Sequence, residues 1–530
     1  MSVGYGSRRV PAAMPSLRLY EAMSRRDFYP GAPAVEVRET HSAWVFLAGK
    51  RAYKVKKPVR MAFLDFSTLE RRRAVCHEEV RVNAALASAL DMRVRAIVVR
   101  AGAYVLAAGA DADEAVEYAI EMRRFDEERT MAALVRRGSL LDGDVRAVAG
   151  RLAGFHAGAD ALAPVDPVGD VQRACDDNVR ELLALAGDAT ARRIRAARRF
   201  SGAFLLAHRE EIAARAAAGR VRDGHGDLRA EHVVLSEPPM IVDRLEFDAG
   251  LRAIDVADDL AFLAMDLESL GAGKAARLLV AAYRDAGGDP GSDALVAFFG
   301  VYRALVRAKV HLLRAAQLDD PDAAAAARAD AGGLLGLAER LAWRARGPLV
   351  LAVGGPPASG KSTLAAALGR RGGWPVLSSD AVRKAGRGID LAARAPDEDY
   401  AVQARAAVYR ELGERAAAAL VAGQGVIVDA TFGEASLRGA FLDGLGERSR
   451  LRAFQCLVPD ALRERWARER SAQTASGSDA SADVAARLAA RHSGWDELAE
   501  EAILTVRPGA GAGGLVDQVA DWLDARPVGA

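Results

Sequence analysis

Hydrophobic and polar residues alternate with two different periods in the first part of the chain. Between 33 and 58 they alternate in the stretches VEVRE, AWVFLA and AYKVKK, which predicts a small antiparallel sheet. A helical pattern follows over 65–90, and the stretches VRAIVV and AYVLAA predict two further strands. From 129 to 220 the pattern is helical, then short strands and loops follow over 221–247, and helices resume from about 256 to 318. We therefore expect an α+β domain here.

The last third of the chain alternates between strand and helix patterns. Apolar strand candidates lie at 348–353, 375–379, 425–429 and 451–458, with helical stretches between them. This order is typical of a doubly wound parallel sheet, an α/β fold.

A stretch with few large apolar residues separates the two parts. The segment 318–333, LDDPDAAAAARADAGG, is the best candidate for a linker, and a short helix over 334–346 is expected to lead into the next strand.

Length and composition exclude several classes of protein. The 530 residues suggest three or four domain-sized units, and 51% hydrophobic with 27% charged residues excludes global disorder. The charge is nearly balanced, 73 basic against 71 acidic residues, which argues against a protein that coats duplex nucleic acid. The three cysteines are far apart and form no CxxC, so neither a disulfide framework nor a cysteine zinc site is expected.

The same features point to a cytoplasmic protein. The N-terminal stretch has no apolar core of signal-peptide length, and no apolar run reaches about 18 residues. We therefore expect no membrane span and no membrane partner.

Lysine is rare in this chain and concentrated at two places. The chain has only eight lysines and 65 arginines. Four of the lysines lie between 50 and 57, and one lies at 361. Because the two side chains are not interchangeable, a retained lysine indicates a need for a compact ammonium group.

The segment 355–363 matches the phosphate-binding pattern G-x-x-x-x-G-K-[ST]. The apolar strand LVLAV precedes it and the helical run TLAAALG follows it, as the motif requires. Glycines let the backbone N–H groups face a phosphate, and the following helix adds a favourable dipole. Lys361 is expected to reach the β- and γ-phosphates and the Ser362 hydroxyl to bind Mg²⁺. The expected ATP-binding residues are Gly355, Pro356, Pro357, Ala358, Ser359, Gly360, Lys361, Ser362 and Thr363.

Two strand ends downstream carry candidate catalytic residues. Asp380 follows the strand PVLSSD and is a candidate base for a substrate hydroxyl, with Arg383 one helical turn later to hold a substrate anion. The alternative is an ordinary helix-capping Asp with a solvated Arg. Asp429 closes the buried strand VIVDATF, which is the Walker-B pattern of a metal-binding Asp, and its alternative is a structural cap.

Arginines recur along LRERWARERSAQ, residues 462–473, at the spacing of a lid helix. Arg465 and Arg470 are candidates to close over the transferred phosphate. A charged, solvated helix face is the alternative.

Residues 348–525 resemble the small P-loop kinases of the polynucleotide kinase, gluconate kinase and zeta toxin kind. The resemblance rests on Gly355, Gly360, Lys361, Ser362, Asp380, Arg383 and Asp429. It implies transfer of the γ-phosphate of ATP to a hydroxyl, with Asp380 as the base.

A second constellation lies at GHGDLRAEHVVL, residues 224–235, and IVDRLEF, residues 241–247. An Asp in a loop entered from His-Gly can act as catalytic base, and a second Asp on a strand 16 residues later can hold Mg²⁺. Asp227 takes the first role and Asp243 the second, with His225 bracing the loop. Upstream, Lys54 on a strand and Glu79 on the following helix offer the Lys–Glu pair of a nucleotide site. Each piece has a structural alternative, but their order is that of a bilobal kinase.

Residues 33–320 resemble the aminoglycoside phosphotransferase family, and more closely a bacterial branch fused to a P-loop kinase. Supporting stretches are AWVFLAGKRAYKVKKPV, FLDFSTLERR, VEYAIEMRRF, GHGDLRAEHVVL and IDVADDLAFLAMDLE. The resemblance implies a bilobal kinase-like fold, and it makes VEYAIEM the hinge that meets adenine through its backbone, at Glu121 and Met122. The expected organisation is an extension (1–32), the kinase-like domain (33–317), a linker and helix (318–346) and the P-loop domain (347–530).

One position departs from the family pattern. The family places an Asn metal ligand five residues after the catalytic Asp, where this chain has His232. Mg²⁺ prefers oxygen ligands and imidazole suits softer metals. Three interpretations follow: one metal held through Asp243 alone, a preference for Mn²⁺ with His232 as a ligand, or binding without catalysis.

Three functions are weighed. The first is an ATP- and Mg²⁺-dependent phosphotransferase acting on an unidentified hydroxyl acceptor, a small molecule or a nucleic-acid end. The second is a regulatory protein with a pseudokinase sensor and a P-loop ATPase switch, which His232 favours. The third is aminoglycoside resistance, for which an acidic pocket is needed; its candidates are Glu246, Asp248, Asp255, Asp258 and Asp259. The helix 302–313 carries Arg303 and Arg307 on one face, either as an anion site or as a solvated surface.

Overall fold

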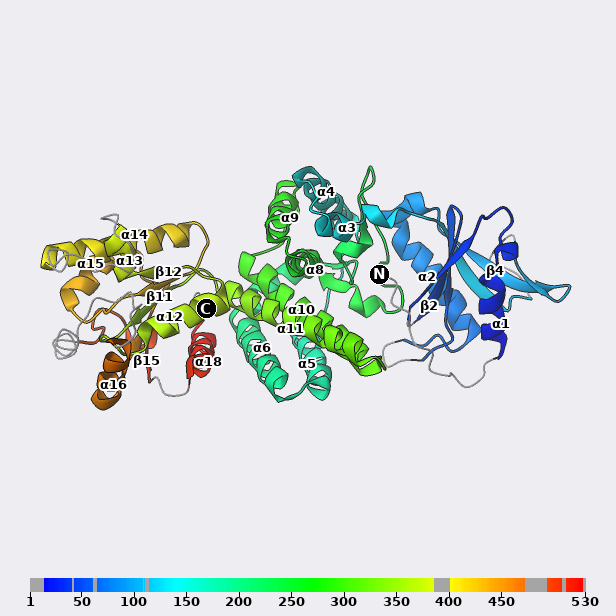
Figure 1. Ribbon diagram of the computed structural model, residues 1–530. Helices are drawn as coiled ribbons and strands as arrows, with labels where there is room; N and C mark the ends of the chain where they lie inside the picture. Colours follow the sequence, from blue (N-terminus) through cyan, green and yellow to red (C-terminus); the bar gives the residue numbers. More distant parts are fainter. Residues whose placement is uncertain are drawn as a thin grey trace. The chain divides into compact units, whose positions relative to one another are not determined.

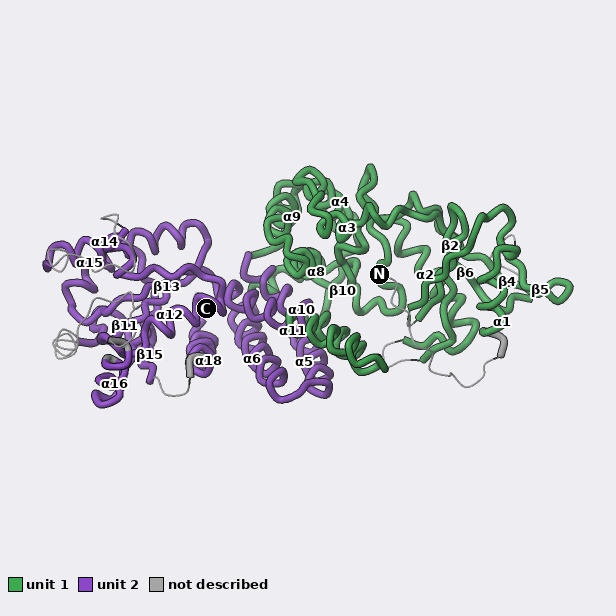
Figure 2. The backbone as a smooth tube through the Cα atoms, in the orientation of Figure 1, with its two compact units in different colours: residues 1–167, 211–292, 306–334 green, residues 168–210, 293–305, 335–530 purple. Residues whose placement is uncertain are grey.

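The chain forms two compact units (Figure 2). The computed structural model describes residues 14–40, 42–60, 64–107, 109, 114–385, 401–471, 493–507 and 511–527. Unit 1 contains residues 1–167, 211–292 and 306–334, and unit 2 contains residues 168–210, 293–305 and 335–530. The helices α10 (Asp293–Gln317) and α11 (Pro321–Ala345) each contribute to both units. Of the helices in the described ranges, none combines the length and apolar character needed to cross a bilayer.

Unit 1 begins with a six-stranded antiparallel sheet in the order β1-β2-β3-β6-β4-β5 (Figure 1). The strands are β1 (Val35–Glu39), β2 (Ala43–Ala48), β3 (Arg51–Lys56), β4 (Arg93–Arg100), β5 (Ala103–Leu106) and β6 (Glu117–Arg123). The sheet expected over 33–58 and the two strands after it are confirmed. Strand β6 was not expected, because its residues were interpreted as a hinge.

Each face of this sheet is covered by a helix. On one face Phe46, Val55 and Ala119 pack with Leu19 and Met23 of α1 (Met14–Met23). On the other face the strands pack against α2 (Leu69–Ala87), whose first turn is capped by the Thr68 side chain. Leu19, Met23, Tyr29 and Ala32 thus contribute to the core of the sheet, whereas the sequence suggested a separate extension over 1–32.

The rest of unit 1 is mainly helical. Its helices are α3 (Met131–Arg136), α4 (Asp142–Gly158), most of α7 (Arg209–Ala217), α8 (Val256–Ser269) and α9 (Gly273–Asp285). Two short strand pairs are β7 (Val221–Asp223) with β10 (Ala253–Asp255), and β8 (Val233–Val234) with β9 (Met240–Ile241). The 3-10 turns are η1 (Arg26–Phe28), η2 (Ser88–Leu90), η3 (Glu127–Arg129), η4 (Ala230–His232) and η5 (Ala249–Leu251). Leu152, Leu228, Ile241 and Leu263 lie in one core that joins these helices to the loop at 224–235.

Unit 2 contains a five-stranded, fully parallel sheet in the order β12-β13-β11-β14-β15. The strands are β11 (Val350–Gly354), β12 (Val376–Ser378), β13 (Val426–Asp429), β14 (Leu451–Cys456) and β15 (Ile503–Val506). The helices around it are α12 (Lys361–Gly372), α13 (Ser379–Ala385), α14 (Val402–Val421), α15 (Ala435–Leu445), α16 (Asp460–Ser471) and α18 (Gly511–Asp524), with the 3-10 turn η7 (Glu500–Ala502).

Helices cover both faces of the parallel sheet (Figure 1). Leu412 of α14 and Phe441 of α15 pack on one face, while Leu364 of α12 and Val519 of α18 pack on the other. The predicted doubly wound α/β fold is therefore confirmed, with β15 as a strand that the sequence did not indicate.

Helices α14 and α15 touch through two glycines. A Cβ on Gly413 would lie 2.2 Å from the Phe441 carbonyl oxygen, and one on Gly444 would lie 2.2 Å from the Arg410 carbonyl oxygen. These two residues let the helix backbones approach closely.

The remaining helices of unit 2 are α5 (Pro167–Leu185) and α6 (Asp188–Ala207). Phe204 of α6 stacks on Phe298 of α10, with ring centroids 4.4 Å apart. The helical interpretation of 129–220 is confirmed, but residues 168–210 of this stretch belong to unit 2.

The expected linker is helical. Residues 321–345 form the single helix α11, in place of a linker followed by a short helix. Ala324, Ala327, Ala331, Leu335 and Ala338 are buried at spacings of three and four residues. Alanine is the best helix former, and here its methyl groups form the buried stripe. The shortage of large apolar residues therefore reflects a close-packed helix.

Candidate active sites

The segment 355–363 forms the expected turn between a strand and a helix. Strand β11 ends at Gly354 and α12 begins at Lys361. Gly355 has φ 147°, and a Cβ there would lie 2.5 Å from Ser359 Oγ and 2.6 Å from the Cys456 carbonyl oxygen. Ala358 and Gly360 are left-handed, with φ of 61° and 82°. This curled backbone can present its N–H groups to a phosphate.

Side chains suited to a nucleotide lie at the same edge of the sheet. Lys361 is half-buried, and Ser362 is exposed in the first turn of α12. Asp429 ends β13, pairs in register with Val353 of β11 and is 8% exposed. The Ser362 hydroxyl and the Asp429 carboxylate are the oxygen donors that Mg²⁺ prefers, so these residues fit the expected ion.

A tyrosine that the sequence did not reveal fixes the loop after Asp429. The Tyr409 hydroxyl lies 2.9 Å from Thr431 Oγ1 and accepts the N–H of Phe432 at 3.2 Å. The N–H of Gly355 donates to the Thr431 carbonyl at 3.1 Å. Tyr409 therefore connects α14 to the phosphate-binding turn through one short segment.

A buried arginine supports the same segment from the other side. Arg438 is fully buried, donates to the Phe432 carbonyl at 3.1 Å and pairs with Glu497 at 2.7 Å. It also donates to Ser493 Oγ at 3.0 Å. Arg438 thus joins residues 493–497 to the loop that follows Asp429.

Asp380 and Arg383 pair with each other. Strand β12 ends at Ser378, which pairs in register with Asp429, and α13 starts at Ser379. Arg383 Nη1 donates to Asp380 Oδ1 at 2.8 Å, so the guanidinium already holds the carboxylate expected to act as base. The side chain of Asp380 is 36% exposed and remains accessible to an acceptor.

The arginines of α16 form local pairs where they are described. Arg463 pairs with Asp460 at 2.7 Å, and the 63% exposed Arg465 lies 3.7 Å from Glu469. The side chain of Arg470, the second lid candidate, lies outside the described residues. The contact of Arg465 agrees with a solvated helix face, whereas Arg463 is 9% exposed, and the lid role stays a prediction.

Unit 1 assembles the second constellation. Lys54 Nζ lies 2.8 Å from Glu79 Oε1 and 2.9 Å from Asp243 Oδ1, so the predicted Lys–Glu pair is present and also includes Asp243. Burial lowers the pKa of Lys54, but the charges of Asp243 and Glu79 outweigh it and raise the pKa well above its ordinary value. Lys54 in turn lowers the pKa of Asp243. The sequence did not predict that Lys56 would pair with the other Glu79 oxygen at 2.6 Å and with Glu246.

A buried carboxylate fixes the loop that carries Asp227. Asp259, in the first turn of α8, accepts the N–H groups of His225 at 2.5 Å and Gly226 at 3.0 Å. His156 Nε2 lies 3.3 Å from the same carboxylate. Burial raises the pKa of Asp259, but its hydrogen bonds and the nearby histidines outweigh this and hold it well below its usual range.

His225 braces this loop as a neutral ring. Its Nε2–H donates to the Val242 carbonyl at 3.0 Å, and its Nδ1 accepts the N–H of Asp227 at 3.3 Å. Burial lowers the pKa of His225 to about 4. The bracing role expected for this residue therefore agrees with its geometry.

The ring of His232 is occupied on both sides. Its Nδ1–H donates to the Asp227 carbonyl at 2.8 Å, and its Nε2 accepts from Arg229 Nη2 at 2.9 Å. Its distance to Asp243 Oδ2 is 3.7 Å. No cluster of three or more metal-ligating side chains occurs in the described ranges. Both ring nitrogens of His232 therefore have protein partners in this arrangement, and its role as a metal ligand stays a prediction.

The expected hinge lies inside the sheet. Glu121 and Met122 belong to β6, between β3 and β4, and the chain leaves the sheet only after Arg123. The Glu121 carboxylate pairs with Arg95 at 2.5 Å, and its backbone lies in register with Tyr53 of β3 and Arg93 of β4, so the sheet occupies the backbone that was expected to meet adenine.

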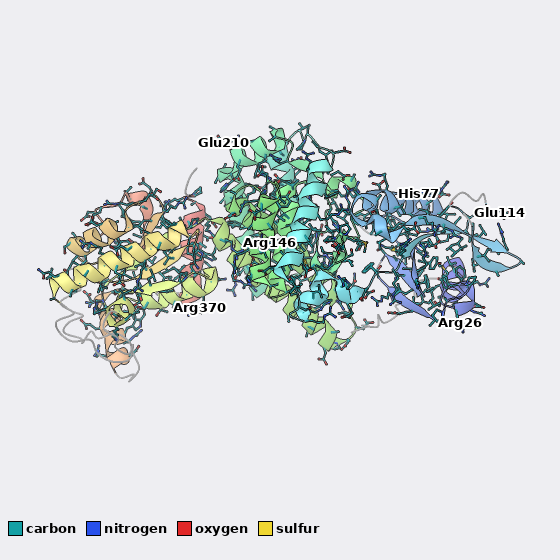
Figure 3. All side chains as sticks on the ribbon, turned by 90° about the horizontal axis from the view of Figure 1, so that it is seen from above. Arg26, His77, Glu114, Arg146, Glu210 and Arg370 are labelled. Carbon is teal, nitrogen blue, oxygen red and sulfur yellow. The ribbon has the colours of Figure 1, made fainter. Side chains whose placement is uncertain are left out.

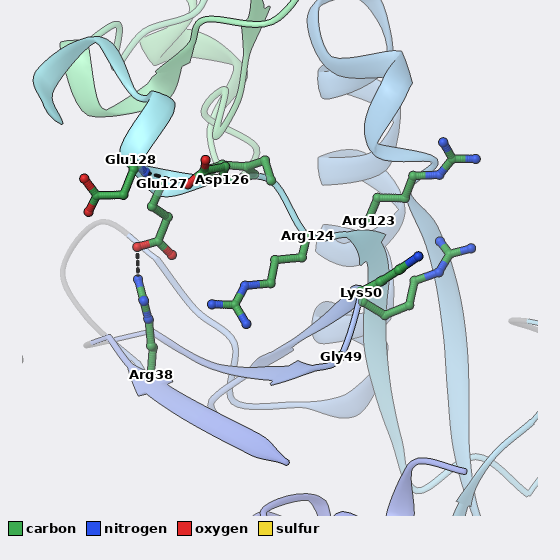
Figure 4. A pocket seen from close by; sticks show the side chains of 10 residues that line it. Arg38, Gly49, Lys50, Arg123, Arg124, Asp126, Glu127 and Glu128 are labelled. Carbon is green, nitrogen blue, oxygen red and sulfur yellow. Dashed lines mark hydrogen bonds and ion pairs between the residues drawn. The ribbon is translucent and has the colours of Figure 1, made fainter. Parts of the chain in front are cut away.

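A pocket of 790 Å³ opens beside this point (Figure 4). Arg38 of β1 reaches across it to pair with Glu127, and Arg124 points into it. Because Arg38 sits in register with Val45, and Val45 with Lys54, this pocket lies on the face of the sheet that carries Lys54. It is the candidate entrance for a nucleotide in unit 1.

The acidic pocket required for aminoglycosides is not formed by the expected residues. Glu246 pairs with Lys56, Asp255 with Arg215 at 2.7 Å, and Asp259 binds the catalytic loop. Asp248 caps the turn at Gly250, and Asp258 is 4% exposed. These carboxylates serve the fold.

Comparisons with known proteins found the following similarities. A family model described as an AAA domain matches residues 350–494. The Mesorhizobium loti choline/ethanolamine kinase family protein is 17% identical, covers 60% of this chain and 94% of its own, and has a TM-score of 0.37. A gluconokinase from Sinorhizobium meliloti 1021 is 18% identical, covers 34% of this chain and 93% of its own, and has a TM-score of 0.25.

The family model matches the part of the chain whose motifs resemble P-loop kinases. The chain combines a kinase-like α+β fold that carries the Lys–Glu pair and the His-Gly-Asp loop with a P-loop fold that the family model also matches. The "Uncharacterized protein Rv2004c" of Mycobacterium tuberculosis is 35% identical over 479 residues, 88% of this chain and 91% of its own. Because this match runs through both units, the chain belongs to the protein family that contains the mycobacterial Rv2004c.

Proposed function

We propose that this protein is an ATP-dependent phosphotransferase that moves the γ-phosphate to a hydroxyl of a small molecule or a nucleic-acid end. The observation that carries the proposal is the turn at 355–360. Its backbone passes so close to Ser359 Oγ and the Cys456 carbonyl oxygen that a Cβ at Gly355 would clash, and it opens onto the N-terminus of α12 with Lys361 beside it. Few arrangements other than phosphate binding require this geometry.

Different residues of unit 2 bind the phosphates, hold the metal ion and accept the proton. Lys361 and the N–H groups of the turn hold the β- and γ-phosphates, and Ser362 with Asp429 holds Mg²⁺, which neutralises phosphate charge when bound. Asp380 accepts the proton of the acceptor hydroxyl. The bond from the γ-phosphorus to the acceptor oxygen forms as the bond to the β-phosphate oxygen breaks, and ADP leaves.

The decisive experiment compares ADP formation by the full chain and its variants. Lys361→Ala should lower turnover by about a hundredfold or more, because a charge that stabilises the transition state is lost. Arg370→Ala, an exposed position on the same helix α12, is the matched control and should leave turnover unchanged. Full activity in Lys361→Ala together with loss in Asp227→Ala would move the chemistry to unit 1 and refute the assignment.

A second variant tests the base. Asp380→Ala should abolish transfer to an identified acceptor while nucleotide binding, measured by equilibrium titration, stays near that of the wild type. Normal transfer by Asp380→Ala would show that another group takes the proton.

A second candidate function is a nucleotide-dependent phosphotransferase site in unit 1. Lys54, Glu79 and Asp243 support a nucleotide site there, whereas the engaged ring of His232 supports a domain that binds without turnover. In a Lys361→Ala background, a sharp gain of Mg²⁺-dependent turnover in His232→Asn would indicate a muted catalytic site. Measurable and unchanged activity in that variant would favour one working metal held by Asp243 alone, whereas no turnover in either chain would favour binding without catalysis.

A further inference from the structure

Two arginines lie beside Asp227. Arg229 Nε donates to Asp227 Oδ1 at 3.1 Å, and Arg229 Nη2 donates to Oδ2 at 3.1 Å. Arg307, on α10, is near enough for its charge to act on both Asp227 and Arg229. One helical turn later, His311 lies 3.4 Å from Asp330. The acceptor hydroxyl of a phosphotransferase must reach Asp227. Arg229 and Arg307 therefore border the acceptor position.

The two arginines differ in how their charges are satisfied. Arg229 is paired with Asp227 and with Glu231. For Arg307 the described part of the chain offers no hydrogen bond and no ion pair, although the side chain is only partly exposed. Burial and the like charge of Arg229 lower the pKa of Arg307. A half-buried guanidinium next to another cation is unfavourable unless an anion completes the site.

The carboxylates nearest to Arg307 have other partners. Glu231 pairs with Arg229, and Asp266 accepts the N–H of Ala230 at 2.8 Å. Asp227 is held by Arg229 through both of its oxygens. The donors of Arg307 therefore remain available to a ligand at the point where the acceptor must bind.

We infer that the acceptor of unit 1 carries an anionic group, a phosphate or a carboxylate, which Arg307 binds while a hydroxyl of the same molecule faces Asp227. A planar guanidinium can hold either group through two parallel hydrogen bonds. The inference rests on the second candidate function, a nucleotide-dependent phosphotransferase site in unit 1.

The transfer balances without a further reactant. The acceptor oxygen forms a bond to the γ-phosphorus of ATP, the bond from that phosphorus to the β-phosphate oxygen breaks, and the hydroxyl proton moves to Asp227. The anionic group stays unchanged and serves only to position the acceptor.

The first test measures turnover with matched acceptors in the Lys361→Ala chain, where unit 2 is silenced. The pairs are glycerol with glycerol 3-phosphate, glucose with glucose 6-phosphate, and glycerol with glycerate, and kanamycin represents the polycations. We expect kcat/KM at least about tenfold higher for an anionic member, lost in Arg307→Ala through a raised KM and partly restored in Arg307→Lys. Arg146→Ala, exposed on α4 (Figure 3), is the control and should retain the preference. Preference for neutral or cationic acceptors would overturn the inference.

The second test separates this inference from the function on which it rests. Inorganic phosphate, compared with sodium chloride at equal ionic strength, should raise the melting temperature of the Lys361→Ala chain but not of the Lys361→Ala, Arg307→Ala double variant. If phosphate stabilises the Lys361→Ala chain but not the double variant, and no acceptor is phosphorylated, the anion site is supported and catalysis in unit 1 is rejected. Equal phosphate effects in the two chains would reject the anion site.

Discussion

His225 offers a sharp test of how the loop of unit 1 is held. The ring is fully buried and neutral, donating to the Val242 carbonyl and accepting from the N–H of Asp227. In the unfolded chain the same ring titrates near pH 6.5, whereas burial lowers its pKa in the folded chain to about 4. Between these two values the unfolded state binds the extra proton and the folded state does not.

The sign and size of the effect follow from this difference. The free energy of unfolding is unaffected by His225 above pH 6.5 and decreases as the pH falls from 6.5 to 4, because the proton favours the unfolded chain. Each pH unit in this window contributes about 1.4 kcal/mol, so the loss is about 2 kcal/mol at pH 5 and about 3 kcal/mol at pH 4.

The substitution His225→Gln removes this titration and keeps a donor for the Val242 carbonyl. Hydrogen exchange of peptides from unit 1, followed by mass spectrometry across a urea series in EDTA, measures its unfolding at pH 7, 6 and 5. The variant should be less stable at pH 7 but should lose about 2 kcal/mol less than the wild type between pH 7 and pH 5. His77→Gln, exposed on α2 (Figure 3), is the control and should keep the wild-type slope. Equal slopes in wild type and His225→Gln would refute the neutral, buried ring.

Three further predictions concern groups with defined partners. Asp259→Asn removes a buried charge that binds two backbone N–H groups. It should lower the stability of unit 1 by about 3 kcal/mol in the same exchange experiment, with a parallel loss of nucleotide binding there. An unchanged stability would show that the loop is held by other contacts. Tyr409→Phe removes the hydroxyl that connects Thr431 and Phe432 and should destabilise unit 2 by about 1 to 2 kcal/mol in urea unfolding monitored by tryptophan fluorescence, and a neutral result would deny that contact a structural role. Gly444→Ala places a Cβ 2.2 Å from a carbonyl oxygen and should cost about 2 kcal/mol or more by the same measurement, whereas Gly439→Ala on the same helix has open space and should stabilise by about 0.5 to 1 kcal/mol; the reverse order would contradict the close contact of α14 and α15.

The parts of both sites that the sequence revealed are local in the chain. The turn at 355–363 is nine residues long and lies between a strand and a helix with distinct patterns, so its conformation follows from neighbours in sequence. The pair of Lys54 and Glu79 was also predictable, because the strand and the helix that carry them are consecutive elements.

The supporting residues were not predictable in the same way. Tyr409 lies 22 residues before Thr431, and it reaches Thr431 only because α14 packs on the sheet. Asp259 offered a signal that was misinterpreted: a carboxylate inside VADDLAFLAMDLE, an almost entirely buried helix, must have a buried partner. Arg307 was weighed as an anion site, but the sequence did not indicate that it lies beside Asp227.

The misjudged linker has a different cause. Large apolar residues were taken as the mark of a packed helix, and α11 achieves its packing with Ala324, Ala327 and Ala331. Pattern analysis that counts alanine at three- and four-residue spacing as apolar would have found this helix.

The carboxylate of Asp259 has a consequence for how this family can diversify. It holds the loop through the backbone N–H groups of His225 and Gly226, so these two contacts do not depend on which side chains stand at 227, 229 and 232. Lineages can exchange those three residues, and with them the chemistry or its absence, while the architecture persists. We expect family members to vary together at these three positions and to keep an acidic residue at 259. The loop conformation would then be kept even where the reaction changes.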